Sequence, residues 1–251
     1  MREILFRCSS LGHLMTEPRT KADGDLSAGA RTYLRQLVKQ EIFSVDFEIS
    51  GKEIEKGLAV ENESIALLNK VRGLALVKNT ERRDNGLITG ECDLFNPPKR
   101  RGHDLKSSWS LKTFPGWAVD CVNPLYEWQM RGYMMLWDAN EWEVNYAMVN
   151  TPEALIRNEP MDQHLVDHIP PQHRLTTWVI ERDFQKESLI RHRCEAARWY
   201  YGQLIREFDA EHRMDVIDVE ARFVTPPTTS KQGANPAAKA PAAPVLLPTL
   251  F

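Results

Sequence analysis

The sequence predicts a single α/β or α+β domain in which helices flank a small, mostly central sheet. Three observations predict this fold class. Segments with the apolar period of a helix alternate along the chain with segments patterned as strands. No internal repeat interrupts this alternation. The 251 residues are 42% hydrophobic and 27% charged, which is ordinary for a folded protein.

The expected helices share apolar residues three or four positions apart, and they span residues 26–43, 56–71, 124–138 and 184–213. Pro124 opens the third of these helices, as is typical of proline in a first helical turn. The expected strands span residues 74–79, 87–95, 102–108, 143–149 and 175–181. Between the first two strands, the residues Asp84, Asn85 and Gly86 predict a turn.

The folded domain is expected to cover residues 1–224. Residues 225–251 are rich in proline and alanine, and such a segment buries too little apolar surface to offset its ordering entropy. We therefore expect a disordered tail. Its end, 245–251, is apolar again, which leaves open a short peptide that docks on a partner or an unselected end.

Composition excludes several classes of protein. No apolar run approaches the roughly 18 residues that span a bilayer, and the first 14 residues do not resemble a signal peptide. The cysteines at 8, 92, 121 and 194 are scattered, which argues against a zinc site, an iron–sulfur cluster and a disulfide framework. These features favour a cytoplasmic protein with reduced thiols. The net charge of −3 neither supports nor excludes a nucleic-acid partner.

Three residues are placed for chemistry at the ends of expected strands. Asp104 and Lys106 are two positions apart, so on a strand both project from one face. Asp93 ends the neighbouring strand, which brings its carboxylate alongside. Either Glu61 or Glu63, from the helix before the strands, supplies a further acid.

Such a set suits metal-dependent cleavage of a phosphodiester. Mg²⁺ takes oxygen ligands and keeps several waters, so two or three carboxylates suffice. The metal polarises the phosphoryl oxygen and lowers the pKa of an attacking water. A neighbouring lysine orients or deprotonates that water. The alternative is that Asp104 and Lys106 form an ordinary surface ion pair.

The flanking residues resemble the PD-(D/E)xK nuclease superfamily, and most closely its YqaJ and lambda-type phage recombination exonucleases. Five segments resemble the family's motifs in the family's order: 7–12 (RCSSLG), 57–61 (GLAVE), 91–93 (ECD), 103–109 (HDLKSSW) and 126–133 (YEWQMRGY). The chain departs from the family at two positions. Asp104 stands where relatives often have glutamate, and Cys92 stands where the superfamily name has proline.

The resemblance implies Glu61, Asp93 and Asp104 as ligands of Mg²⁺ or Mn²⁺, with the backbone carbonyl of Leu105 as a further one. Glu61 is favoured over Glu63 because it fits the family's G-x-x-x-E spacing. Lys106 would position the attacking water.

The resemblance also implies a supporting set of residues. Gln129 would hydrogen-bond near the site, and Ser9 and Ser10 would contact a phosphate. Tyr126 and Tyr133 share a helix face with Gln129, and they contact substrate or pack in the core. A serine that caps a helix looks the same in sequence as one that contacts phosphate.

Two further surface features are candidates for DNA contact. Trp109 and Trp117 follow Lys106, and aromatic side chains there stack on unpaired bases. The basic run 99–101 supplies backbone contacts to phosphate or is a solvated turn.

The fold that the resemblance implies is a restriction-endonuclease-like core. The activity that it implies is a Mg²⁺-dependent exonuclease that degrades duplex DNA from its ends, to leave single strands for recombination. A structure- or site-specific endonuclease and a non-catalytic DNA- or protein-binding module are the alternatives. The implied partners are DNA ends, a single-strand annealing protein and further copies of the chain in a ring.

Overall fold

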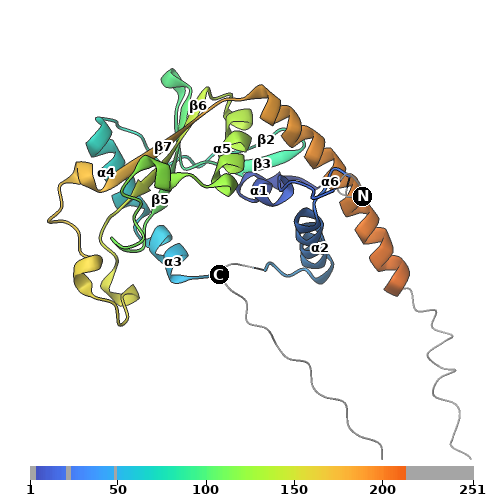
Figure 1. Ribbon diagram of the computed structural model, residues 1–251, viewed down its shortest axis with the longest axis horizontal. Helices are drawn as coiled ribbons and strands as arrows, with labels where there is room; N and C mark the ends of the chain where they lie inside the picture. Colours follow the sequence, from blue (N-terminus) through green and yellow to red (C-terminus); the bar gives the residue numbers. More distant parts are fainter. Residues whose placement is uncertain (1–3, 21–23, 48–49, 213–251) are drawn as a thin grey trace, which may run out of the picture. The chain divides into compact units, whose positions relative to one another are not determined.

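The computed structural model describes residues 4–20, 24–47 and 50–212 (Figure 1). Residues 1–209 form one compact unit. The second unit, 210–251, is described only for 210–212, the end of the last helix. The predicted boundary at 224 and the predicted tail both lie outside the described residues.

The helices and strands alternate as the sequence predicts. The helices of the described part are α1 (Leu11–Leu14), α2 (Ala28–Phe43), α3 (Lys52–Ala59), α4 (Glu61–Arg72), α5 (Pro124–Trp137) and α6 (Phe184–His212). The strands are β1 (Phe6–Arg7), β2 (Arg82–Asp84), β3 (Ile88–Glu91), β4 (Leu94–Asn96), β5 (Arg101–Ser107), β6 (Glu141–Ala147) and β7 (Leu175–Glu181). The short β1, β2 and α1 have no clear signal in the sequence.

The strands form two mixed sheets, where the sequence predicts one central sheet. The smaller sheet has the order β1-β3-β2, and the larger has the order β4-β5-β6-β7. β5 and β6 are parallel, whereas β4 and β7 run antiparallel to their neighbours. Helix α5 packs on one face of the larger sheet and α4 on the other (Figure 1). The predicted class, a mixed sheet flanked by helices, is confirmed.

Three predicted elements differ from the structure. The single strand expected at 87–95 is divided into β3 and β4, which belong to different sheets. The helix expected at 56–71 is broken at Val60, because α3 turns Lys56 inward whereas α4 buries the apolar side chains Ile65 and Leu68. The strand expected at 74–79 does not form. Its backbone is instead tied to α4, since the Asn69 side chain bonds both the N–H and the carbonyl of Leu76, at 3.0 and 2.8 Å.

The core beside α5 requires a glycine in β5. Trp142 of β6 packs with Tyr133 and Trp137, and its ring lies against Gly102. A Cβ atom at position 102 would lie 2.3 Å from the ring of Trp142, which is far inside van der Waals contact. The missing side chain therefore lets the two strands and α5 close on one aromatic cluster.

Helix α3 buries a lysine and exposes apolar residues. The Lys56 ammonium is fully buried and donates to the carbonyl oxygens of Ser108, Trp109 and Val149 at 2.5, 3.1 and 3.0 Å. Burial lowers the pKa of Lys56 to about 8. Because the acceptors follow β5 and β6, this lysine fixes the carboxyl ends of the two parallel strands.

Candidate active site

Asp104 and Lys106 lie together on the α5 face of β5, as their spacing predicts. The Lys106 Nζ is 2.8 Å from Asp104 Oδ2, and the carboxylate side chain is only 3% exposed. Burial is the largest single influence and by itself would lower the pKa of Lys106, but the close contact with charged Asp104, together with the charge of Asp93, outweighs it and raises that pKa above its ordinary value. The lysine therefore stays an ammonium group at neutral pH.

Asp93 completes a pair of carboxylates. It lies between β3 and β4, and its Oδ2 accepts a 2.7 Å hydrogen bond from the backbone N–H of Leu105. Burial and then the charge of Asp104 raise the pKa of Asp93 to about 7. A pair of carboxylates that resist simultaneous ionisation is typical of sites that hold a cation.

Glu61 approaches this pair from the first turn of α4. Its charge helps to raise the pKa of Asp93, after burial and the charge of Asp104, so Glu61 lies within electrostatic range of that carboxylate. Its Oε2 is held in an ion pair by Lys78. Glu63 lines a different pocket, between α4 and residues 149–152. The geometry therefore favours Glu61 of the two acids.

Helix α5 places the predicted glutamine and tyrosines around the pair. Gln129 Nε2 donates to the Tyr133 hydroxyl at 3.2 Å, and that hydroxyl donates to the carbonyl of Glu91 at 3.1 Å. Burial and then the charge of Asp104 raise the pKa of Tyr133, which keeps it a donor. The ring of Tyr126 lies 4.5 Å from Lys106 Nζ, in a cation–π contact.

The predicted phosphate-contacting serines form part of a short 3₁₀ turn, Cys8–Ser10, that packs against α5. Ser9 is exposed, whereas Ser10 is partly buried and hydrogen-bonds the Tyr33 hydroxyl of α2. Ser10 thus has a structural partner, and Ser9 alone presents its hydroxyl to the surface. Neither side chain caps the 3₁₀ turn itself or the adjoining helix α1.

The donor set fits a hard divalent cation. Across residues 4–20, 24–47 and 50–212, no three His, Cys, Asp or Glu side chains already surround a common metal position. Asp104 Oδ2 is nevertheless buried without a hydrogen bond of good geometry, although it lies in the ion pair with Lys106. Two carboxylates would suit Mg²⁺, which takes oxygen ligands and keeps several of its waters.

The two tryptophans expected to contact DNA differ in exposure. Trp109 is only 4% exposed, because its indole N–H donates to Glu159 and its ring packs edge-on against His164. Trp117 is 73% exposed. Burial thus leaves Trp109 unavailable for the expected stacking on bases, whereas Trp117 is exposed.

The basic run 99–101 is partly neutralised in the structure. Arg100 pairs with Asp138 at 2.6 Å, and Arg101 pairs with Glu141 and Glu143. His103 is buried with its Nδ1 3.2 Å from Glu143, on the face of β5 away from Asp104. Two of the three basic side chains therefore have partners within the fold.

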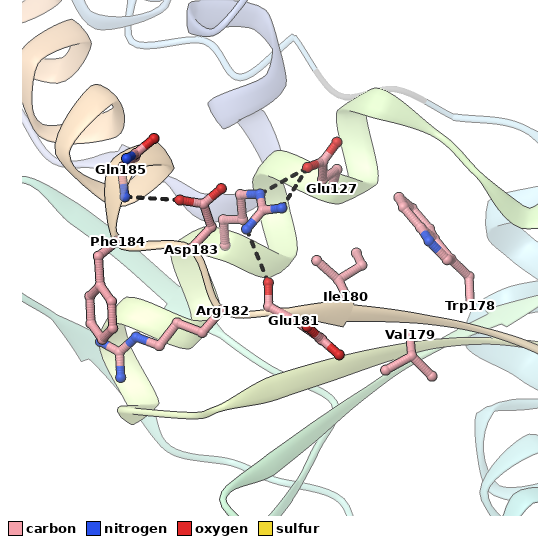
Figure 2. A pocket seen from close by; sticks show the side chains of 10 residues that line it. Glu127, Trp178, Val179, Ile180, Glu181, Arg182, Asp183, Phe184 and Gln185 are labelled. Atoms are coloured by element: carbon pink, nitrogen blue, oxygen red, sulfur yellow. Dashed lines mark hydrogen bonds and ion pairs between the residues drawn. The ribbon is translucent and has the colours of Figure 1, made fainter.

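One pocket of the protein lies apart from the carboxylates. Its volume is about 630 Å³, and it lies between Glu127 of α5, strand β7 and the start of α6 (Figure 2). Arg131 also lines the pocket, and its guanidinium donates to Glu127 at 2.7 Å and to the carbonyl of Glu181 at 3.2 Å. The lining of this pocket therefore includes none of the predicted site residues.

The structure has relatives among solved proteins. A phage-related exonuclease from Haemophilus somnus 129PT is 36% identical, with a TM-score of 0.78, and the match covers 82% of this chain and 97% of that one. An alkaline exonuclease from Laribacter hongkongensis is 14% identical over 82% of this chain and 92% of that one, with a TM-score of 0.59. The same enzyme in complex with dAMP has a TM-score of 0.56 at 15% identity, with the same coverage. The latter two show the fold alone.

Comparisons with protein-family models and with curated proteins give no match. Among the residues that the structure describes, no helix is both long and apolar enough to cross a membrane.

Proposed function

The chain belongs to the family of phage-related exonucleases, and we propose that it is a metal-dependent deoxyribonuclease that degrades duplex DNA from its ends. One observation carries the proposal for the site. Asp93, Asp104 and Lys106 converge at β5, with a buried carboxylate oxygen, a carboxyl group of raised pKa and a charged ammonium. That combination suits a cation and a phosphate bound side by side.

Asp93 and Asp104, with the carbonyl of Leu105, would hold the metal, and Glu61 would join them. The ion, when bound, offsets charge on the phosphate and lowers the pKa of a bound water. Lys106 stays protonated beside Asp104, so it orients water and donates to the phosphate rather than removing a proton. The contact with Tyr126 holds the lysine side chain in place.

The remaining polar residues of α5 have a positioning role. Gln129 and Tyr133 link α5 to the end of β3 through the carbonyl of Glu91. The link fixes the distance between α5 and the segment that carries Asp93. Ser9 and the exposed Trp117 contact the DNA in this proposal, through phosphate and base respectively.

The same proposal covers the wider role of the enzyme. It acts in the cytoplasm of a bacterial host, where it leaves single strands for recombination. A single-strand annealing protein is the natural partner, because the product strand must be protected and paired. Ring-shaped oligomers that enclose the DNA would make digestion processive.

A digestion assay on linear and covalently closed circular duplex DNA tests the function. We expect Mg²⁺ to support loss of the linear DNA, EDTA to prevent it, and the closed circle to survive. Cutting of both substrates would indicate an endonuclease of the same fold. Cutting of neither substrate, with Mg²⁺ or Mn²⁺, would refute the enzyme and leave a binding module.

Acid pH is expected to raise the metal requirement. The folded pKa of Asp93 is about 7, above its ordinary value of 3.8, so the folded protein holds a proton in this interval that the unfolded chain releases. Ionisation of Asp93 as the pH rises through about 7 therefore lowers the free energy of unfolding, and a bound cation offsets that loss. Below that pH the ion must displace the proton, so the half-saturating Mg²⁺ concentration should rise about tenfold per pH unit.

Cleavage rates measured against Mg²⁺ concentration at several pH values between 5.5 and 8.5 give this dependence. Above pH 7 the half-saturating concentration should become constant. A requirement that does not change across the whole range would contradict the assignment of Asp93 as a metal ligand.

A further inference from the structure

Asn79, the next residue in the chain, holds Lys78 close to the acidic residues of the site. The backbone N–H of Asn79 donates to the carbonyl of Asp93 at 2.7 Å, and its side chain donates to the carbonyl of Cys92 at 3.1 Å. These bonds fix the segment that carries Lys78 against the segment that carries Asp93. The position of Lys78 is therefore set by backbone contacts with the site itself.

The Lys78 ammonium pairs with Glu61, the acid that begins α4. The hydrogen bond that Lys78 donates to Glu61, and then the charges of Glu61, Asp93 and Glu91, raise the pKa of Lys78. The lysine side chain is 48% exposed, compared with 25% for Lys106. Lys78 thus contacts the acidic cluster on one side and solvent on the other.

We propose that Lys78 is a second lysine of the active site, which holds Glu61 until a divalent cation takes that carboxylate and which then binds a DNA phosphate. This inference rests on the proposed function, because it names a residue of the same site.

Charge balance favours the exchange. When all three acids are ionised, Glu61, Asp93 and Asp104 carry one negative charge more than Lys78 and Lys106 offset. A divalent ion brings the balance to +1 and competes directly with Lys78 for the oxygens of Glu61. The displaced ammonium, already half exposed, then lies beside the path of an anionic backbone, and phosphate is its available partner.

The first arm of the test measures Mn²⁺ binding to the DNA-free full chain by titration calorimetry. Lys78→Met removes the competitor for Glu61, so the variant should bind Mn²⁺ about threefold to fivefold tighter than wild type, as expected for a partly exposed ion pair. The control Lys70→Met removes an exposed lysine of the same helix as Glu61, and its affinity should not change. Equal or weaker Mn²⁺ binding by Lys78→Met would overturn the proposal.

The second arm measures cleavage at saturating metal and increasing salt. Lys78→Met should raise the KM for DNA and reduce the slope of log KM against log salt by about 1, while kcat stays within about twofold. A merely structural lysine would not move the salt slope, so an unchanged slope also overturns the proposal. Thermal unfolding of Lys78→Met and Lys78→Gln checks that both variants are folded.

The two arms separate this inference from the proposed function. If wild type cleaves DNA but the variant matches it in metal affinity and salt slope, only the role of Lys78 fails. If wild type binds Mn²⁺ without cleaving any DNA, the proposed function fails. The comparison of Mn²⁺ affinities between wild type and Lys78→Met still tests whether Lys78 competes with the metal for Glu61.

Discussion

Lys106→Met is expected to lower the rate of DNA cleavage by about 10³-fold, while the protein still binds a divalent metal ion. The ammonium is the charged donor closest to Asp104, and methionine keeps the length of the side chain without a charge or a donor. Metal binding should persist or tighten, because the substitution leaves the acidic cluster more negative. Single-turnover digestion of linear duplex DNA gives the rate, and calorimetry gives the affinity for Mn²⁺.

Lys70→Met is the matched control for this variant, since it makes the same change at an exposed position on α4. The control should cleave at the wild-type rate. If Lys106→Met retained more than a tenth of the wild-type rate, the lysine would be a structural partner of Asp104 only.

Asp104→Asn is expected to abolish cleavage to a similar extent, more than about 10³-fold, with little loss of stability. The reason is that Asp104 is both a proposed ligand and the neighbouring charge that raises the pKa of Asp93. Asparagine keeps the shape and removes that charge, so the pKa of Asp93 should fall toward 3.8, its ordinary value. The free energy of unfolding at pH 8 should stay within about 1 kcal/mol of wild type, since the repulsion and the ion pair with Lys106 are lost together.

Urea unfolding at pH 8 measures the stability of Asp104→Asn, and the digestion assay measures its rate. Asp120→Asn, at an exposed position between β5 and α5, is a matched control that should leave both quantities unchanged. A strong loss of stability in Asp104→Asn alone would indicate that the carboxylate serves the fold rather than the chemistry.

The period of strands and helices accounts for most of what the sequence predicts correctly. The alternation at 175–181 matches β7 residue for residue, and the spacing of two between Asp104 and Lys106 places both side chains on one face. Such predictions need only local geometry. The strand expected at 74–79 fails because a side chain of α4 takes up the backbone groups of Leu76, and local apolar content does not reveal that competitor.

The less predictable part of the site depends on contacts between distant segments. Asp93 reaches the backbone of Leu105 only once β4 and β5 form a hairpin. Lys78 pairs with a glutamate 17 positions earlier, from a segment that the pattern assigned to a strand. Trp109 follows the site lysine closely in sequence, yet a distant glutamate takes its indole N–H and keeps it inside. Sequence spacing alone carries no signal for partners of this kind.

The lysine buried in α3 gives the protein a built-in counterpart of a bound potassium ion. Three carbonyl oxygens surround the Lys56 Nζ, as they would surround a monovalent cation, but here the positive charge belongs to a side chain of the protein. The ends of β5 and β6 therefore stay joined at any salt concentration and need no ion from solution. Arginine cannot replace it, because a planar guanidinium directs its donors outward in a fork rather than from one point. Position 56 is thus restricted to lysine by geometry, far more tightly than the exposed Ile54 and Leu58 on the same helix are restricted.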